Sequence, residues 1–220
     1  MNIILLAPPA AGKGTQSEKI VSKYNLKHIS TGDLLRNCLK NNDELSNQIR
    51  EIMNQGKLVD DEIIIKLIEK ELTNSSLNGF VLDGFPRSLA QAKKFNELLN
   101  KLNKHLDLVL YLNIDKENAL NRIIGRRTCP NCGRIYNILI ENSKPLNENL
   151  CDECNVSLTK REDDNEVTFN KRYDTYVTET SPLIDFYKNQ GLLVEFDSSL
   201  DADLVFENII KELDLIKWFQ

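Results

Sequence analysis

Residues 7–15 place the strongest constraint on how this chain folds, because they follow directly on an apolar run at residues 3–6. The run has the composition of a buried strand, and it leads into small residues that end in Gly12, Lys13 and Gly14. In such a loop, successive backbone N–H groups point toward one position at the start of the next helix, where the helix dipole also favours an anion. A lysine at that position adds a mobile cation, so the sequence predicts a nucleoside triphosphate site.

The loop departs from the usual pattern G-x-x-x-x-G-K-[ST] in two places. Ala7 stands at the first glycine position and Gly14 at the Ser/Thr position, while Thr15 supplies a hydroxyl one residue later. Small residues between a strand and a helix also allow close packing without any ligand. The remaining motifs decide between these two interpretations.

Four further apolar segments, at residues 28–30, 80–83, 108–112 and 192–196, are typical of buried strands. Longer amphipathic segments separate them. This alternation predicts an α/β fold in which a five-stranded parallel sheet is flanked by helices on both faces. Ligands of such a sheet bind beyond the carboxyl ends of the strands.

Two segments interrupt the alternation and are expected to be insertions that move over the ligand edge. Residues 31–60 have a helical pattern without a strand, and residues 127–162 contain all the paired cysteines. A further helical stretch is expected from Asp163 toward Asn189, because Glu166 follows Asp163 at capping-box spacing.

A carboxylate and a guanidinium follow one of the predicted strands. Asp83 ends the apolar segment at residues 80–83, and Arg87 comes four residues later. Asp83 is suited to hold Mg²⁺ through water, and Arg87 to grip a phosphate with two hydrogen bonds. The alternative is an ordinary turn with a surface arginine, which the nearby Lys13 motif makes less favoured.

Further arginines are expected to supply the positive charge that phosphoryl transfer needs. Arg122 and Arg126 are four residues apart in a helical stretch and share one face, and Arg127 extends the cluster. Arg161 and Arg172 add two more guanidinium groups. Such groups stay charged and bind phosphate oxygens in a fork. Any one of them alone would be interpreted as part of a solvated helix surface.

Two Cys-x-x-Cys pairs, separated by 18 residues, have the spacing of a four-cysteine zinc site. They consist of Cys129, Cys132, Cys151 and Cys154. Four thiolates fill a tetrahedral shell and leave no position for water, so the metal is expected to be structural. Iron accepts the same ligands. A zinc ribbon that binds nucleic acid is the alternative, and the acidic residues 152–153 disfavour it.

Composition excludes several classes of partner. The net charge of −5 argues against general affinity for nucleic acid. The sequence has no run of about 20 apolar residues, and its amino terminus lacks the basic and long apolar segments of a secretion signal. Paired cysteines favour metal over disulfides in a reducing compartment. We therefore expect a cytoplasmic protein with no membrane or nucleic-acid partner.

Taken together, these motifs resemble those of the adenylate kinase family in its long, zinc-bearing form. The resemblance covers nearly all 220 residues, with the motifs in matching order at compatible spacings. They are residues 13–16 (KGTQ), 30–36 (STGDLLR), 56–59 (GKLV), 83–87 (DGFPR), 91 (Q), 125–127 (GRR) and 161–164 (REDD).

The resemblance implies a P-loop nucleoside monophosphate kinase fold in which the chain divides into three parts. The core domain would comprise residues 1–29, 60–124 and 165–220, with an AMP-binding insertion at residues 30–59 and a zinc-stapled lid at residues 125–164. The implied reaction is reversible transfer of the γ-phosphoryl group from magnesium-bound ATP to AMP, which gives two molecules of ADP. The implied assembly is a monomer.

The same resemblance implies the site residues by motif position. ATP would be held by Ala10, Ala11, Gly12, Lys13, Gly14, Thr15, Arg122, Arg126, Ile135, Tyr136 and Leu200. AMP would be held by Thr31, Arg36, Lys57, Leu58, Val59, Gly84, Phe85, Pro86, Arg87, Gln91, Arg161 and Arg172. The catalytic groups would be Lys13, Asp83, Arg87, Arg126, Arg161 and Arg172.

The phosphate loop departs from the family pattern G-x-P-G-x-G-K-G-T. Here the first and fourth positions are Ala7 and Ala10, and the second is Pro8. An alanine forced into the left-handed conformation is strained by about 1 to 2 kcal/mol. The methyl group of Ala10 would also crowd a phosphate. We therefore expect glycine at both positions to tighten ATP binding.

Two other functions stay open beside adenylate kinase activity. One is a related kinase that pairs GTP with AMP, or ATP with UMP or CMP. The other is a nucleotide-binding protein that the altered loop has left with little or no activity. Gln91 and the cysteine-bearing lid favour AMP as acceptor by resemblance, and the retention of Lys13 and Asp83 favours an active enzyme.

Overall fold

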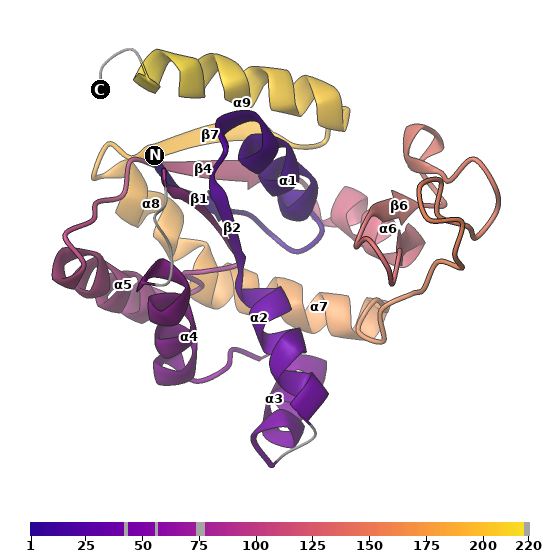
Figure 1. Cartoon of the computed structure of the whole chain (residues 1–220), viewed down its shortest axis with the longest axis horizontal. Coiled ribbons are helices and arrows are strands. Elements are labelled where there is room, and N and C mark those ends of the chain that lie inside the picture. Colours follow the sequence, from indigo (N-terminus) through magenta and orange to yellow (C-terminus); the bar gives the residue numbers. More distant parts are fainter. Residues whose placement is uncertain (42–43, 56, 74–77, 218–220) are drawn as a thin grey trace.

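A computed structural model describes residues 1–41, 44–55, 57–73 and 78–217 (Figure 1). Its centre is a parallel five-stranded sheet in the order β2-β3-β1-β4-β7. The strands are β1 (Asn2–Leu6), β2 (Lys27–Ser30), β3 (Phe80–Asp83), β4 (Leu108–Asn113) and β7 (Leu193–Asp197). The predicted α/β fold and its five strands are confirmed, with strand ends that shift by one residue in several cases.

Helices cover both faces of the sheet, because alternate residues of a strand point to opposite sides. On β1, Ile3 and Leu5 belong to one buried cluster and Ile4 and Leu6 to the other, and none of the four is more than 2% exposed. The first cluster includes side chains of α1 (Lys13–Tyr24), α6 (Lys116–Gly125) and α9 (Ala202–Lys217). The second includes side chains of α4 (Asp61–Thr73), α5 (Leu89–Lys101) and α8 (Pro182–Lys188).

Two segments project from this layered core. The first contains α2 (Thr31–Cys38), a 3-10 turn (Leu39–Asn41) and α3 (Glu44–Asn54), and it has no strand in its described part. The second, residues 125–164, is called the lid segment below. It contains the antiparallel pair β5 (Arg126–Thr128) and β6 (Ile135–Asn137), followed by a 3-10 turn (Glu141–Ser143). Figure 1 shows α3 below the sheet and the lid segment to its right.

The chain returns from the lid segment through a helical stretch. This stretch consists of α7 (Glu166–Thr175), a π-helical turn (Tyr176–Thr180) and α8. The prediction that Asp163 caps it is wrong. Asn165 is the N-cap, because its side-chain oxygen accepts a hydrogen bond of 2.9 Å from the backbone N–H of Thr168. Asp163 instead forms an ion pair with Arg172.

A buried hydroxyl in the core leads to a stability prediction. Tyr187 on α8 is fully buried in the cluster that also contains side chains of α4 and α5, and its hydroxyl has no hydrogen-bond partner among the described residues. Burial also raises the pKa of this phenol. An unpaired buried hydroxyl costs about 1 to 3 kcal/mol. We expect Tyr187→Phe to raise the free energy of unfolding by about 1 kcal/mol in urea melts.

Tyr111→Phe is the matched control for this prediction. The Tyr111 hydroxyl lies 3.0 Å from that of Tyr176, so its loss should destabilise the fold. Equal or lower stability of Tyr187→Phe would show that its hydroxyl has a partner in solution.

Candidate active site

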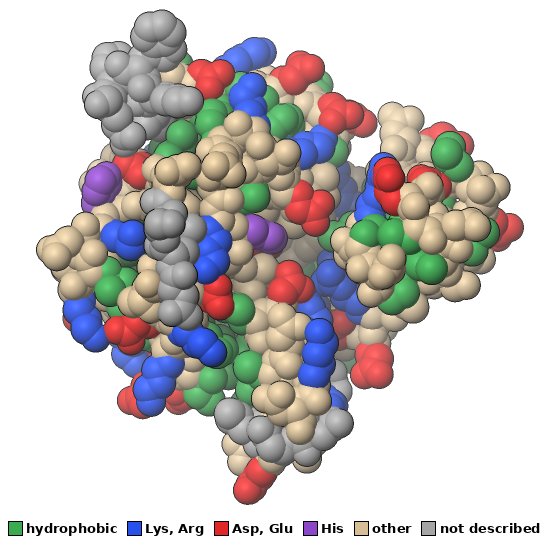
Figure 2. All heavy atoms as spheres, in the orientation of Figure 1, with side chains coloured by type: hydrophobic (Ala, Val, Ile, Leu, Met, Phe, Trp, Pro, Cys, Tyr) green, Lys and Arg blue, Asp and Glu red, His purple; other side chains and the backbone are tan. Residues whose placement is uncertain are grey.

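A cleft opens at the carboxyl ends of the strands, between the core, the segment with α2 and α3, and the lid segment. Its volume is about 1640 Å³, whereas a pocket for one drug-sized ligand usually has about 300 to 1,000 Å³. The cleft therefore has room for two nucleotides. Figure 2 shows lysine and arginine side chains gathered around the hollow between the core and the lid segment.

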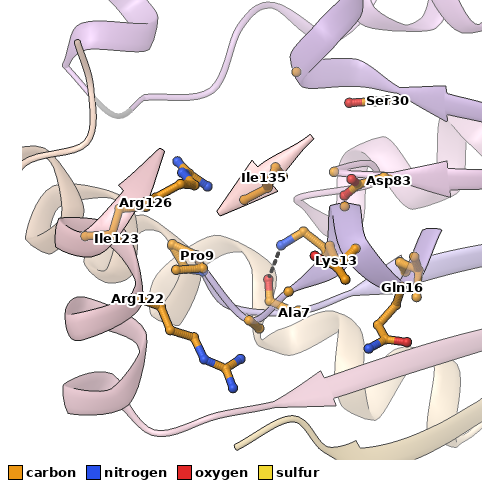
Figure 3. A pocket seen from close by; sticks show the side chains of 18 of the residues that line it. Ala7, Pro9, Lys13, Gln16, Ser30, Asp83, Arg122, Ile123, Arg126 and Ile135 are labelled. Atoms are coloured by element: carbon orange, nitrogen blue, oxygen red, sulfur yellow. Dashed lines mark hydrogen bonds between the residues drawn. The ribbon is translucent and has the colours of Figure 1, made fainter. Parts of the chain in front are cut away.

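The phosphate loop forms one wall of the cleft. It joins β1 to α1, and Gly12 takes the left-handed conformation with φ of 85° just before the helix begins. The ammonium group of Lys13 donates hydrogen bonds to the carbonyl oxygens of Ala7 (3.3 Å) and Pro8 (3.2 Å), so it lies against the loop (Figure 3). Burial lowers the pKa of Lys13 to about 8, against an opposing effect of the Asp83 carboxylate.

The two loop alanines differ in conformation. Ala10 has φ of 63°, in the left-handed region, and lines the cleft. Ala7 has no positive φ and is 8% exposed, packed with the buried cluster around Ile3 and Leu5. The expected strain is therefore present at Ala10 and absent at Ala7.

We expect Ala10→Gly to tighten MgATP binding several-fold, since it removes the methyl group beside the phosphate position. Relief of the left-handed strain should in addition stabilise the fold. Ala7→Gly is the matched control, and it should weaken the fold by about 1 kcal/mol because it removes a buried methyl group and adds backbone freedom. Titration calorimetry with a non-hydrolysable ATP analogue measures the first effect and thermal melts measure the second. Equal affinity of Ala10→Gly and the unaltered chain would contradict this account.

The turn after β3 also lines the cleft. Gly84 has φ of 79°, and a Cβ atom there would lie 2.9 Å from Oγ1 of Thr31, so the position requires glycine. The Thr31 hydroxyl donates a hydrogen bond of 2.9 Å to the carbonyl of Gly84. Arg87 donates from Nε to the same carbonyl at 2.7 Å and from its backbone N–H to Oε1 of Gln91 at 2.8 Å. This turn is thus held in place by side chains from two other elements.

Carboxylates of the lid segment hold two of the predicted arginines. Asp164 is fully buried and forms a bidentate ion pair with Arg126, with one hydrogen bond of 2.8 Å from Nε. Asp163 pairs with Arg172 on α7. Burial, followed by repulsion from Arg126 and Arg36, lowers the pKa of Arg161 to about 10. The cleft therefore brings like charges together, as a site for a polyanion requires.

Arg127 does not join this cluster, so that expectation is wrong. Its guanidinium donates hydrogen bonds to the carbonyl oxygens of Arg126 (2.8 Å) and Ile124 (3.4 Å), and it does not line the cleft. Arg126 and Arg127 are successive residues of β5, whose side chains point to opposite faces.

Arg122 approaches the loop that follows β7. Its guanidinium donates hydrogen bonds of 3.5 Å to the hydroxyl of Ser198 and to the carbonyl of Ser199. The Ser198 hydroxyl in turn donates to the carbonyl of Ala11 at 2.6 Å. Leu200 lines the same end of the cleft. Figure 3 shows Arg122 and Arg126 on either side of the phosphate loop.

The lid segment touches the phosphate loop through β6. A Cβ atom placed on Gly14 would lie 3.5 Å from Cδ1 of Ile135, so the two residues face each other across the cleft. Tyr136 also lines the cleft, but its hydroxyl points to the cysteines. The Asn137 amide donates a hydrogen bond of 2.9 Å to the carbonyl of Arg122 and so ties β6 to α6.

The four cysteines lie together in the lid segment. Their sulfur atoms are all within 4.8 Å of one another, and those of Cys132 and Cys151 are 3.7 Å apart. Metal–sulfur bonds of about 2.3 Å in a tetrahedron place the sulfurs about 3.8 Å apart, so the cluster fits a zinc-type ion. A hydrogen bond with the Tyr136 hydroxyl lowers the pKa of the Cys151 thiol to about 6.

The structure brings every predicted nucleotide-binding residue to this one cleft. Besides those described above, Thr15, Arg36, Lys57, Leu58, Val59, Phe85 and Pro86 line it. Gly56, part of the GKLV motif, lies outside the described residues. Arg36 is held by an ion pair of 2.5 Å with Asp33.

Sequence reasoning missed several residues of the cleft. His28 lies on β2 with Nε2 3.9 Å from the Asp83 carboxylate, and Thr180 donates a hydrogen bond of 2.7 Å to the carbonyl of Arg87. The register of β2 and β3 places Ser30 opposite Asp83 and His28 opposite Val81, so no sequence pattern indicated the approach of His28 to Asp83. No local pattern marks Thr180, which lies 93 residues from its partner.

The parallel sheet, the phosphate loop at the start of α1 and the arginine-lined cleft define a P-loop nucleoside monophosphate kinase. A family model described as adenylate kinase matches residues 5–192. The chain is 45% identical to the adenylate kinase of Kosmotoga olearia over 97% of this chain and 99% of that one. It is 42% identical to the adenylate kinase of Archaeoglobus fulgidus over 99% and 100% of the two chains, and 43% identical to that of Clostridioides difficile over 97% and 98%. The chain therefore belongs to the adenylate kinase family.

Proposed function

We propose that this chain is a phosphotransferase that reversibly transfers the γ-phosphoryl group of ATP to AMP and gives two molecules of ADP. The observation that carries the proposal is one cleft in which the phosphate loop and the turn after β3 face the same arginines. Family membership supports the same reaction.

ATP would occupy the side of the cleft formed by α1 and the lid segment. The N–H groups of residues 10–15 would surround its β- and γ-phosphates at the start of α1, with the Lys13 ammonium beside them. Arg122 and Leu200 would flank the base, since the Arg122 guanidinium reaches from α6 to the loop after β7 that contains Leu200. Ile135 would cover the loop from the lid segment.

AMP would occupy the side formed by α2 and the turn after β3. Arg36 and Arg87 would bind its phosphate, and residues 57–59 would enclose the base. The Oε1 atom of Gln91 accepts from the backbone of Arg87, and its amide donates to Asp61 at 2.8 Å. Gln91 would therefore contact AMP through its remaining amide proton while holding the turn.

Transfer between the two nucleotides requires in-line approach and charge neutralisation. An oxygen of the AMP phosphate attacks the γ-phosphorus, the bond to the β–γ bridging oxygen breaks, and ADP leaves with that oxygen. Arg126, Arg161 and Arg172 surround the cleft between the two subsites and would stabilise the charge on the transferring group. Phosphate oxygens would replace the carboxylates of residues 163–164 as partners of Arg126 and Arg172.

Asp83 would hold the magnesium ion of ATP through water molecules, because its carboxylate ends β3 inside the cleft. When bound, the ion neutralises part of the charge on the β- and γ-phosphates. The four cysteines would hold a structural zinc ion that stabilises the lid segment, whose own buried cluster is small.

The two projecting segments would act as moving covers over the core. Residues 30–59 would close on AMP and residues 125–164 on ATP, which excludes water until both substrates are bound. We further propose a monomer in the cytoplasm. Four of the five cysteines lie together as candidate metal ligands, an arrangement typical of proteins in a reducing compartment. No helix among the described residues is long and apolar enough to cross a membrane.

The deciding experiment measures ADP formation from MgATP and AMP in metal-loaded protein. Parallel assays replace ATP with GTP and AMP with UMP or CMP. We expect turnover to depend on AMP and to be fastest with the ATP and AMP pair. Faster turnover with another pair would assign a related kinase activity, and no turnover with any pair would identify a nucleotide-binding protein.

A further inference from the structure

Tyr136 lies between the cysteine cluster and the nucleotide cleft. It is 4% exposed on β6, and its hydroxyl oxygen is 3.4 Å from Sγ of Cys151. The same oxygen accepts a hydrogen bond of 2.9 Å from the backbone N–H of Asp152. The guanidinium of Arg134 covers its ring at 5.4 Å from the ring centre. Asp152, the residue that follows Cys151, therefore holds the Tyr136 hydroxyl in place beside the Cys151 sulfur.

The direction of the hydrogen bond follows from the chemistry of the two groups. A metal-bound cysteine is a thiolate, which has no proton and can only accept. The Asp152 N–H already donates to the Tyr136 oxygen, so the single hydroxyl proton is left for the sulfur. The hydroxyl and the sulfur therefore match as donor and acceptor once the cluster holds a metal.

The strand that carries Tyr136 also faces the phosphate loop. Ile135 lies opposite Gly14, and Asn137 is hydrogen-bonded to the carbonyl of Arg122. Because side chains alternate along a strand, these neighbours point to the cleft and the core while the ring of Tyr136 points into the lid segment. One three-residue strand thus contacts the cluster, the phosphate loop and α6.

We propose that Tyr136 is a positioning residue of the metal centre, whose hydroxyl donates a hydrogen bond to the metal-bound sulfur of Cys151 and fixes the cluster to β6. Groups that orient metal ligands from outside the coordination shell typically change metal affinity by about ten- to a hundredfold when removed. This inference rests on the metal site included in the proposed function.

The first test compares the unaltered chain with Tyr136→Phe after each is loaded with Co²⁺. A hydrogen bond lowers the energy of the sulfur lone pair and so raises the energy of charge transfer from sulfur to cobalt. Its removal should therefore move the charge-transfer band to longer wavelength. Tyr187→Phe is the matched control, because it also removes one buried tyrosine hydroxyl but lies in the core. We expect the band to move in Tyr136→Phe alone.

The second test follows release of Zn²⁺ to a chromogenic chelator. We expect release from Tyr136→Phe to be about ten- to a hundredfold faster, and release from Tyr187→Phe to be unchanged. An unchanged band together with an unchanged release rate would overturn the role of Tyr136. Failure of the unaltered chain to bind Co²⁺ or Zn²⁺ would overturn the metal site itself, so the two failures are distinguishable.

A third measurement does not depend on the folding of a variant. Replacing the tyrosines with 3-fluorotyrosine makes each hydroxyl a stronger donor while keeping its shape. We expect the charge-transfer band to move to shorter wavelength and zinc release to slow. A band and a release rate equal to those of the unlabelled protein would overturn the proposal.

Discussion

Replacing Lys13 with alanine should lower kcat/KM for MgATP by about a hundred- to a thousandfold, the usual effect of removing one group that stabilises the transferring charge. Lys13 lines the cleft at the start of α1, where its ammonium lies against the carbonyl oxygens of Ala7 and Pro8. Steady-state assays at saturating AMP measure the effect.

Lys23→Ala is the matched control for Lys13→Ala. Lys23 is exposed in the last turn of the same helix and stacks over the ring of Tyr24, 5.9 Å from its centre. We expect its removal to leave kcat/KM within about twofold of the unaltered chain. If Lys13→Ala keeps more than a third of its activity, the loop binds phosphate through its backbone alone and the role given to the ammonium is wrong.

The position of Lys13 could be predicted because short-range physics fixes it. An apolar strand, a turn of small residues and a helix place the residue after Gly12 at the helix start, whatever the rest of the fold does. The same holds for Asp83, which ends β3 at the carboxyl edge of the sheet. Parallel pairing then brings the two residues to one edge, since β1 and β3 are neighbours.

The conformation of Ala10 shows where such reasoning ends. The sequence showed that an alanine stood at a family glycine position, but strain depends on one backbone angle. The structure puts the left-handed angle at Ala10 and not at Ala7. Ala7 instead packs in the core. Glycine at position 10 is therefore expected to tighten MgATP binding, whereas glycine at position 7 is expected to lower the stability of the fold.

The sequence pattern also does not predict which charged residues form ion pairs with each other. The residues of the REDD motif were recognised as a unit, yet only the structure shows that Asp164 holds Arg126 and Asp163 holds Arg172. For the same reason the spacing of Asp163 and Glu166 predicts a helix cap at Asp163, whereas the cap is Asn165. An aspartate can satisfy a helix end or an arginine, and the choice depends on residues that lie far away in the sequence.

Tyr136 illustrates a third limit, which concerns the direction of a side chain. The family resemblance implies that the Ile135 and Tyr136 pair contacts ATP, and Tyr136 does line the cleft. Its hydroxyl, however, lies 3.4 Å from the sulfur of Cys151. The alternation of a strand gives opposite directions to neighbours, but the pattern alone does not show which of them faces the nucleotide.

Replacing Cys151 with serine should unfold much of the lid segment while leaving the core folded. Cys151 is 1% exposed, and the buried cluster around it contains only two other fully buried residues, Cys129 and Tyr136. In the proposed function a bound metal stabilises so small a cluster, and metal binding contributes about 10 to 16 kcal/mol in small zinc domains. The variant should lose bound zinc and at least tenfold in turnover, because Arg126 and Arg161 are no longer held over the cleft.

Hydrogen exchange separates this local effect from general loss of stability. We expect amides of residues 126–160 to exchange quickly in Cys151→Ser, with β1, β3 and β4 as protected as before. Cys38→Ser is the matched control, because Cys38 is the one cysteine outside the cluster and packs half-buried at the end of α2. It should keep both the zinc and the protection of the lid segment. Equal exchange in Cys151→Ser and the unaltered chain would mean that the lid segment folds without its metal, and that the cysteines serve another purpose.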